Sequence, residues 1–93
     1  MNKFDVWVVD EHGNGIEGVE VHLIFQSIFS GFTTEYTNLY GHAEFDEYAT
    51  GEVEVFLDSE SYGKYLYEDG GGITINKYGD EGDSDENNDD EKE

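Results

Sequence analysis

The turn DEHGNG, which begins at Asp10, places potential metal ligands between two apolar runs. A calcium loop of the EF-hand type takes oxygen ligands from positions 1, 3 and 5 and closes with a glutamate at position 12. Counting from Asp10 places His12 at position 3, Asn14 at position 5 and Val21 at position 12. Because nitrogen and an apolar side chain stand where calcium needs oxygen, we interpret these residues as turn formers that connect the first two strands as a hairpin.

The sequence evidence for a metal site elsewhere in the chain is equally weak. Counting a calcium loop from Asp83 puts Asn88 where the glycine belongs, and the sequence stops before position 12. The three histidines, His12, His22 and His42, are the usual zinc ligands and proton acceptors, but the chain has no cysteine and no histidine pair at ligand spacing. We therefore expect exposed histidines without a role, and we predict no metal site, no cofactor, no catalytic residue and no enzymatic activity.

The elements that would position these residues follow a period of two, which is typical of strands. Val19, Val21, Leu23 and Phe25 share one face of a run whose polar residues share the other. Glycine-containing breaks recur at short intervals, so the pattern predicts an all-β, seven-stranded antiparallel Greek-key β-sandwich. The expected strands are Phe4–Val9, Val19–Phe25, Phe32–Thr37, His42–Tyr48, Glu52–Asp58, Lys64–Tyr67 and Ile73–Lys77.

The chain has room for one domain, because 93 residues bury only about two thirds of their unfolded surface. From residue 80 onward the sequence DEGDSDENNDDEKE contains neither aromatic nor aliphatic side chains. Such a segment cannot offset the entropy cost of its own ordering. We expect a β-sandwich domain over 1–79 and a disordered acidic tail over 80–93.

Three segments, VVDEHGNGIEGVEVHLIF, GFTTEYTNLYGHAEF and ATGEVEVFLD, together resemble the carboxypeptidase regulatory-like and transthyretin-like sandwiches. The resemblance covers roughly Val6 to Asp58 and implies a sandwich fold and a non-catalytic accessory role. A hydroxyisourate hydrolase among these sandwiches needs arginine, which this chain lacks. Related adhesin sandwiches link a lysine to an asparagine, with the help of a buried acid, and Lys3 and Asn76 lie in expected strands. The strand after Gly51 presents Val53, Val55 and Leu57 inward where that acid would be needed, so we favour an ordinary charged Lys3.

Charge narrows the class of partner. The sequence has 24 acidic residues, four lysines and no arginine, for a net charge of −20. Nucleic acid and anionic membranes are therefore disfavoured as direct partners. No apolar stretch is long enough for a membrane span, and the N-terminus has no signal-peptide apolar core, so we expect a soluble, cytoplasmic protein; a domain cut from a longer exported protein would have the same sequence pattern. Removing the tail still leaves fifteen acids against three lysines, and this excess suggests a halophilic host.

Aromatic residues give the remaining signal, with seven Tyr, six Phe and one Trp. Trp7 and Val9 form an apolar second face on the first strand, which either a neighbouring segment or a partner must cover. We take Trp7 and Val9 as the candidate partner-binding residues. The predicted function is a small non-catalytic binding module with an unidentified protein partner. The alternative is an acidic nucleic-acid mimic that occupies basic DNA-binding surfaces.

Overall fold

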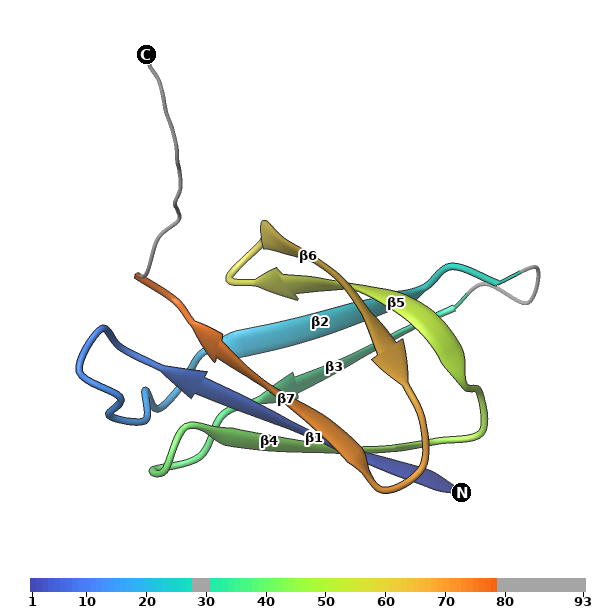
Figure 1. Cartoon of the computed structure of the whole chain (residues 1–93), viewed down its shortest axis with the longest axis horizontal. Helices are drawn as coiled ribbons and strands as arrows, with labels where there is room; N and C mark the ends of the chain where they lie inside the picture. The colour runs from blue at the N-terminus through green and yellow to red at the C-terminus, as the bar shows by residue number, and fades with distance from the viewer. Residues whose placement is uncertain (28–30, 79–93) are drawn as a thin grey trace, which may run out of the picture.

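The computed structural model describes residues 1–27 and 31–78, which form an all-β domain of two stacked sheets (Figure 1). The expected tail over 80–93, and the domain end at residue 79, lie outside the described residues. The described part contains seven strands: β1 (Asn2–Val9), β2 (Glu20–Phe25), β3 (Phe32–Tyr36), β4 (His42–Glu47), β5 (Gly51–Leu57), β6 (Glu60–Tyr67) and β7 (Gly71–Asn76).

The core lies between the sheets and is built by the period-two alternation. Inward positions of the central strands are fully buried, whereas their neighbours in sequence are half-buried or exposed. The predicted apolar face of the second strand is confirmed, and β5 buries Val53, Val55 and Leu57 in the same way. The buried apolar residues are Phe4, Val6, Val8, Val19, Val21, Leu23, Phe25, Ala43, Phe45, Val53, Val55, Leu57, Tyr67 and Ile75.

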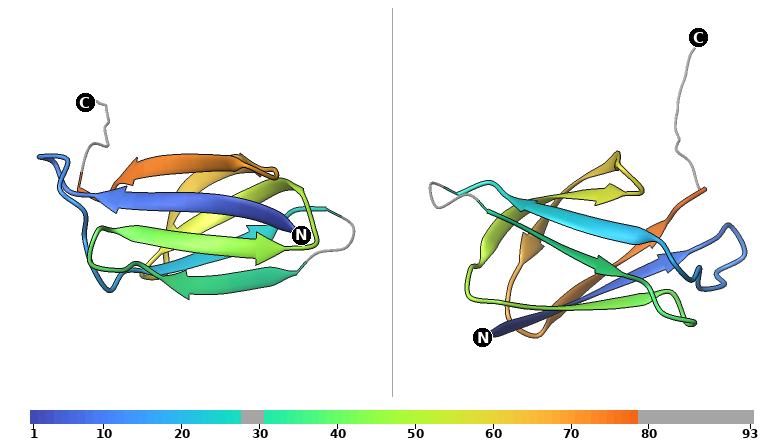
Figure 2. Two further views of the ribbon diagram at one scale, coloured as in Figure 1. Left: turned by 90° about the horizontal axis from the view of Figure 1, so that it is seen from below. Right: turned by 180° about the vertical axis from the view of Figure 1, so that it is seen from behind.

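A three-stranded sheet of order β4-β1-β7 packs on a four-stranded sheet of order β3-β2-β5-β6 (Figure 2). The expected hairpin between the first two strands is therefore wrong. Both edges of β1 are already hydrogen-bonded, to β4 on one side and to β7 on the other. The connection that begins at Asp10 instead crosses to the opposite sheet, where β2 starts.

The expectation of a wholly antiparallel sandwich also needs correction, because β1 and β7 are parallel. β6 ends in the four-stranded sheet, and the turn over residues 68–70 carries the chain across to the three-stranded sheet. Two hydrogen bonds hold that turn beside the start of β1: Gly70 N–H donates to the Lys3 carbonyl at 2.8 Å, and Lys3 N–H donates to Asp69 Oδ1 at 2.9 Å. β7 consequently runs in the same direction as β1.

The sixth strand begins four residues earlier than expected, at Glu60 rather than Lys64. A turn at Asp58 and Ser59, both at positive φ (50° and 75°), joins it to β5 without glycine. A bulge follows, where two residues of β6, Tyr62 and Gly63, face the single residue Val55. The bulge interrupts the alternation, which explains why the first half of this strand was not recognised from sequence.

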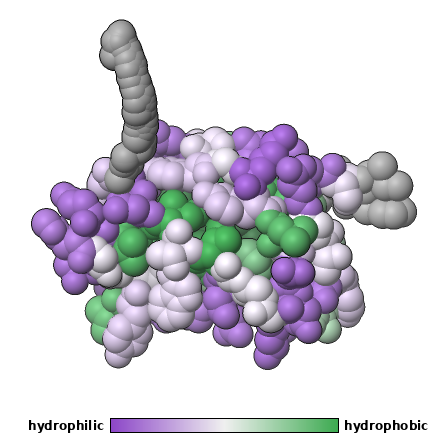
Figure 3. Space-filling view, in the orientation of Figure 1, coloured by the Kyte–Doolittle hydropathy of each residue, from purple (hydrophilic) through white to green (hydrophobic). Residues whose placement is uncertain are grey.

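The two open sides of the sandwich, where the edges of the two sheets meet, are closed in different ways. On one side Thr33 Oγ1 of β3 donates to Glu47 Oε2 of β4 at 2.8 Å, which ties the two sheet edges together. On the other side, β6 and β7 leave a band of apolar surface that crosses the face seen in Figure 3. Ile73 of β7 and Tyr62 and Tyr65 of β6 are partly buried and pack against the core.

Candidate functional site

The turn after β1 is built by the Asp10 carboxylate. Its Oδ1 atom accepts hydrogen bonds from the backbone N–H of His12 at 2.8 Å and of Asn14 at 2.9 Å. The bond from Asn14 is the main cause that lowers the pKa of Asp10 below its ordinary value. One of the two carboxylate oxygens of Asp10 is thus used by the loop itself, and turn formation accounts for these residues.

Trp7 and Val9 lie on the outer face of the three-stranded sheet. Trp7 is 41% exposed, and its ring stacks on the imidazole of His42 with centroids 4.2 Å apart. Val9 is half-buried and lies opposite Asn76 of β7. β4 therefore covers one side of the Trp7 ring and leaves the remainder available to a partner.

The expectation that the histidines are exposed and without a role is wrong for two of the three. His42 Nε2 lies 2.8 Å from Asp5 Oδ1, in addition to its stacking on Trp7. His22 Nδ1 lies 2.7 Å from Thr34 Oγ1. Strand register is the reason, since it places Trp7 directly opposite His42 and Thr34 directly opposite His22.

The strand register also argues against a Lys3–Asn76 link. Asn76 lies opposite Val9, six residues along β1 from Lys3. At about 3.3 Å per residue, the two side chains start roughly 20 Å apart. The interpretation of Lys3 as an ordinary charged residue fits this geometry.

The outer face of the four-stranded sheet carries a cluster that sequence reasoning missed. We call it the aromatic face and define it by Ile24, Phe32, Tyr36 and Phe56, with His22 at its centre. His22 contacts two of these rings: its centroid lies 5.2 Å from that of Phe32 and 6.2 Å from that of Phe56. Phe32 is 73% exposed and Tyr36 is 63% exposed. The solvent side of an antiparallel sheet is normally polar, so this apolar cluster is unusual.

A sequence signal for the aromatic face did exist. In the run VHLIF of β2 and the run VEVFL of β5, Ile24 and Phe56 occupy positions that the alternation reserves for polar residues. Either residue alone is unremarkable for a surface. Only strand pairing, which sets Phe56 opposite His22 and Phe32 opposite Ile24, gathers them into one surface.

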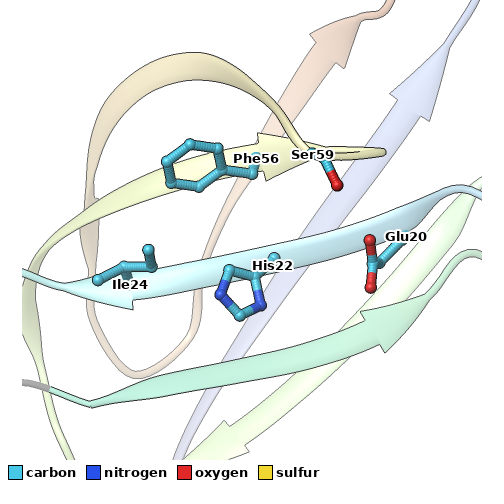
Figure 4. Close-up of a pocket in the computed structure, with 5 residues that line it drawn as sticks. All are labelled: Glu20, His22, Ile24, Phe56 and Ser59. Carbon is cyan, nitrogen blue, oxygen red and sulfur yellow. The ribbon is translucent and has the colours of Figure 1, made fainter.

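A shallow pocket of about 310 Å³ opens on the aromatic face (Figure 4). Its lining comes from β2, from β5 and from the turn after β5: Glu20, His22, Ile24, Phe56 and Ser59. Glu20 and Ser59 lie toward one end of the group and Ile24 toward the other, with the His22 and Phe56 rings between them. The pocket is thus polar at one end and apolar at the other.

Glu20 is the carboxylate in the lining of the pocket, and its hydrogen bond within the protein is weak. Its Oε2 atom accepts a hydrogen bond from the Tyr36 hydroxyl at the long distance of 3.5 Å. The neighbouring Asp58 carboxylate is already engaged, because it accepts from the Glu20 backbone N–H at 3.0 Å and pairs with Lys77 Nζ at 3.6 Å. Glu20 can therefore accept hydrogen bonds from a ligand without breaking a short one.

Among residues 1–27 and 31–78, no group of three or more acidic, histidine or cysteine side chains could hold a metal ion. The same residues include no helix that is long and apolar enough to cross a membrane. The chain matches no protein-family model and has no significant sequence similarity to a curated protein.

Proposed function

We propose that this protein is a non-catalytic interaction module that binds another protein through the aromatic face. The observation that carries the proposal is the set of apolar side chains, Ile24, Phe32, Tyr36 and Phe56, at outward positions of neighbouring strands. Aromatic side chains supply large contact area at a small entropy cost and are enriched in the centres of protein interfaces. A partner that covers Phe32 and Tyr36 removes from water the most exposed part of this cluster.

The charge of the chain defines the complementary partner. Fifteen acids and three lysines within residues 1–79 give that part of the chain a net charge of −12. Glu20 and Glu54 stand on the same side of the four-stranded sheet as the aromatic face, and Lys64 is the cation opposite Glu54. A partner with an apolar centre and a basic rim fits this arrangement, because opposite potentials favour encounter and orientation.

The fold supports a finer proposal about ancestry. A two-sheet sandwich with seven strands and a glycine-containing turn after the first strand is compatible with the resemblance to carboxypeptidase regulatory-like and transthyretin-like sandwiches, and with their Greek-key connections. An accessory role in place of catalysis follows from that resemblance. A cytoplasmic location in a salt-rich cell is the setting that the acid excess favours.

The alternative, an acidic mimic of nucleic acid, makes a different use of the same charge. A mimic presents carboxylates to a basic DNA-binding protein and needs no apolar surface. The salt dependence of partner binding distinguishes the two functions, because counterion-driven binding weakens steeply as the salt concentration rises, whereas binding through an apolar interface persists.

A photo-crosslinking amino acid placed at Phe32 tests the proposal in cells of the native host. Tyr48, 86% exposed and outside the aromatic face, provides the matched control position. We expect a specific adduct from position 32, which also forms when a lysate is irradiated in about 1 M KCl, and little adduct from position 48. Equal adducts at both positions would contradict the proposal, and an adduct that no longer forms when irradiation is carried out at high salt, or with competing DNA, would favour the mimic.

A further inference from the structure

We infer that the pocket in the aromatic face binds an arginine side chain of the partner. The inference rests on the proposed function and adds the chemical identity of the residue that anchors the partner. Three features of the pocket support it: an available carboxylate, two ring faces and the length of the pocket along β2.

The carboxylate is Glu20. A guanidinium group donates hydrogen bonds in a planar fork that matches the two oxygens of a carboxylate. Glu20 is half-buried, and its internal contact is the long 3.5 Å bond that Oε2 accepts from the Tyr36 hydroxyl, which a guanidinium group can replace. Ser59, at the same end of the pocket, can accept a further hydrogen bond with its hydroxyl oxygen.

The rings are those of His22 and Phe56, which lie side by side between Glu20 and Ile24 in Figure 4. A guanidinium plane stacks well on aromatic faces and is less strongly hydrated than an ammonium group. His22 is held in place from its other side, because its Nδ1 atom is bonded to Thr34 Oγ1 at 2.7 Å. This hydrogen bond orients the His22 ring before a ligand arrives.

The dimensions favour a long side chain. Glu20 and Ile24 are four residues apart on one strand, which corresponds to roughly 13 Å. An arginine can place its methylene groups against Ile24 and Phe56 while its head reaches Glu20. Lysine reaches as far, but its compact ammonium group neither stacks on a ring nor bonds both carboxylate oxygens in one plane.

Three small probes test the assignment: N-acetylarginine methylamide, the corresponding lysine compound and the corresponding citrulline compound. Citrulline has the shape of arginine without its charge. In amide chemical-shift titrations at about 0.15 M salt, we expect saturable shifts with arginine at residues 20, 22, 56 and 59, with a dissociation constant in the millimolar range. Lysine should bind about fivefold or more weakly, and citrulline should not saturate.

Three variants distinguish arginine binding in the pocket from a general attraction of arginine to an acidic protein. Glu20→Gln keeps the shape of the pocket and should weaken arginine binding about tenfold or more. Glu44→Gln, an equal charge change at an exposed position of the other sheet, should leave it unchanged within about twofold. Phe56→Leu keeps an apolar wall, removes the ring and should reduce the preference for arginine over lysine.

The inference is overturned if arginine and citrulline bind alike, if Glu20→Gln and Glu44→Gln have the same effect, or if the shifts lie outside the pocket. These results differ from a failure of the proposed function. An adduct at position 32 with no arginine binding would leave the interaction module in place and remove only the anchor. No adduct and no arginine binding would remove both.

Discussion

The Tyr67 hydroxyl donates a hydrogen bond to the backbone carbonyl of Asn2 at 2.6 Å, which joins residues 65 positions apart and the two sheets of the sandwich. The same hydroxyl accepts a bond from the Glu47 backbone N–H at 3.2 Å. The Tyr67 ring is fully buried and stacks on Phe4 at 4.7 Å and against the edge of Phe25 at 5.2 Å. One side chain of β6 thus contacts strands β1, β2 and β4.

Removing that hydroxyl should destabilise the fold. In Tyr67→Phe the ring stays in the core, but the Asn2 carbonyl and the Glu47 N–H lose a partner, at a cost of about 1–3 kcal/mol in the free energy of unfolding. Urea denaturation measures this cost. Tyr48→Phe, which alters a tyrosine that is 86% exposed, should change the free energy by less than about 0.5 kcal/mol. Equal effects in the two variants would refute the structural role of the Tyr67 hydroxyl.

The same residue should make stability depend on alkaline pH. Burial raises the pKa of Tyr67 to about 12, above its ordinary value of 10.0. Because the folded-state pKa is the higher one, the neutral phenol stabilises the fold fully below pH 10, and this contribution disappears as the pH rises from 10 through 12. The loss amounts to roughly 2–3 kcal/mol. Comparing wild type with Tyr67→Phe between pH 9 and 12 isolates it, and parallel curves would exclude it.

A second close contact joins the loops at the opposite end of the sandwich. A Cβ atom added to Gly15 would lie 2.0 Å from the Tyr40 carbonyl oxygen and 2.9 Å from Gly41 N. Because these neighbours are backbone atoms, Gly15→Ala should cost about 3 kcal/mol or more in the free energy of unfolding. Gly13, in the same loop, has φ of +85° and no atom within 4 Å of such a Cβ.

Gly13→Ala is therefore the matched control, and it should cost only about 1–2 kcal/mol for the left-handed backbone conformation. Thermal denaturation of both variants measures the difference. A Gly15→Ala variant as stable as Gly13→Ala would show that the two loops do not approach as closely as the structure places them.

The sequence predicted those features that depend on short-range pattern. The alternation in Val19–Phe25 identified a buried face correctly, and glycine-containing breaks located most strand ends. The connection of the strands was not predictable in this way. The turn DEHGNG is equally suitable for a hairpin and for a crossing between sheets, and the difference arises because β4 and β7 occupy both edges of β1. The parallel pairing of β1 with β7 has the same long-range origin.

The candidate site shows the same difference between features that depend on short-range sequence pattern and features that depend on long-range strand pairing. The alternation places Trp7 on the face of its strand that points away from the core, and the structure leaves its side chain 41% exposed. His42, its stacking partner, lies 35 residues later and was unrecognised, because register decides which residues meet across a sheet. The aromatic face was missed for the same reason, since its members come from three strands whose order in the sheet is β3-β2-β5.

Trp7 can report which sheet a partner covers. It is the only tryptophan in the chain and is 41% exposed on the outer face of the three-stranded sheet. If a partner binds the aromatic face, acrylamide should quench Trp7 fluorescence equally in the free and bound protein. If a partner covers Trp7 and Val9, quenching should fall about twofold or more, and Trp7→Ser should weaken binding while the β-sheet circular dichroism is retained. The partner used in this experiment must contain no tryptophan, so that all of the measured tryptophan fluorescence comes from Trp7.

Salt should stabilise this protein strongly. Acidic side chains are spread over both sheets, with Glu44 and Asp46 on β4 and Glu52 and Glu54 on β5, and residues 1–79 contain only three lysines to balance fifteen acids. At about 0.01 M ionic strength charges interact over about 30 Å, which is comparable with the 43 × 32 × 21 Å extents of the part of the chain that the structure describes, whereas at about 1 M the range falls to about 3 Å. Repulsion that opposes folding at low salt is therefore screened at high salt.

The measurement is a series of thermal melts in KCl from roughly 0.05 to 2 M at neutral pH. We expect the midpoint to rise by about 10 °C or more, as relief of roughly 2 kcal/mol would give in a domain of this size. A variant that carries Glu11→Lys, Glu44→Lys and Glu60→Lys, all at exposed positions, should melt higher at low salt and respond less to KCl. A chain ending at residue 78 should respond less as well, because nine acids and one lysine are removed with the tail. A midpoint that stays flat in the full chain would contradict both the repulsion argument and the proposal of a salt-rich host.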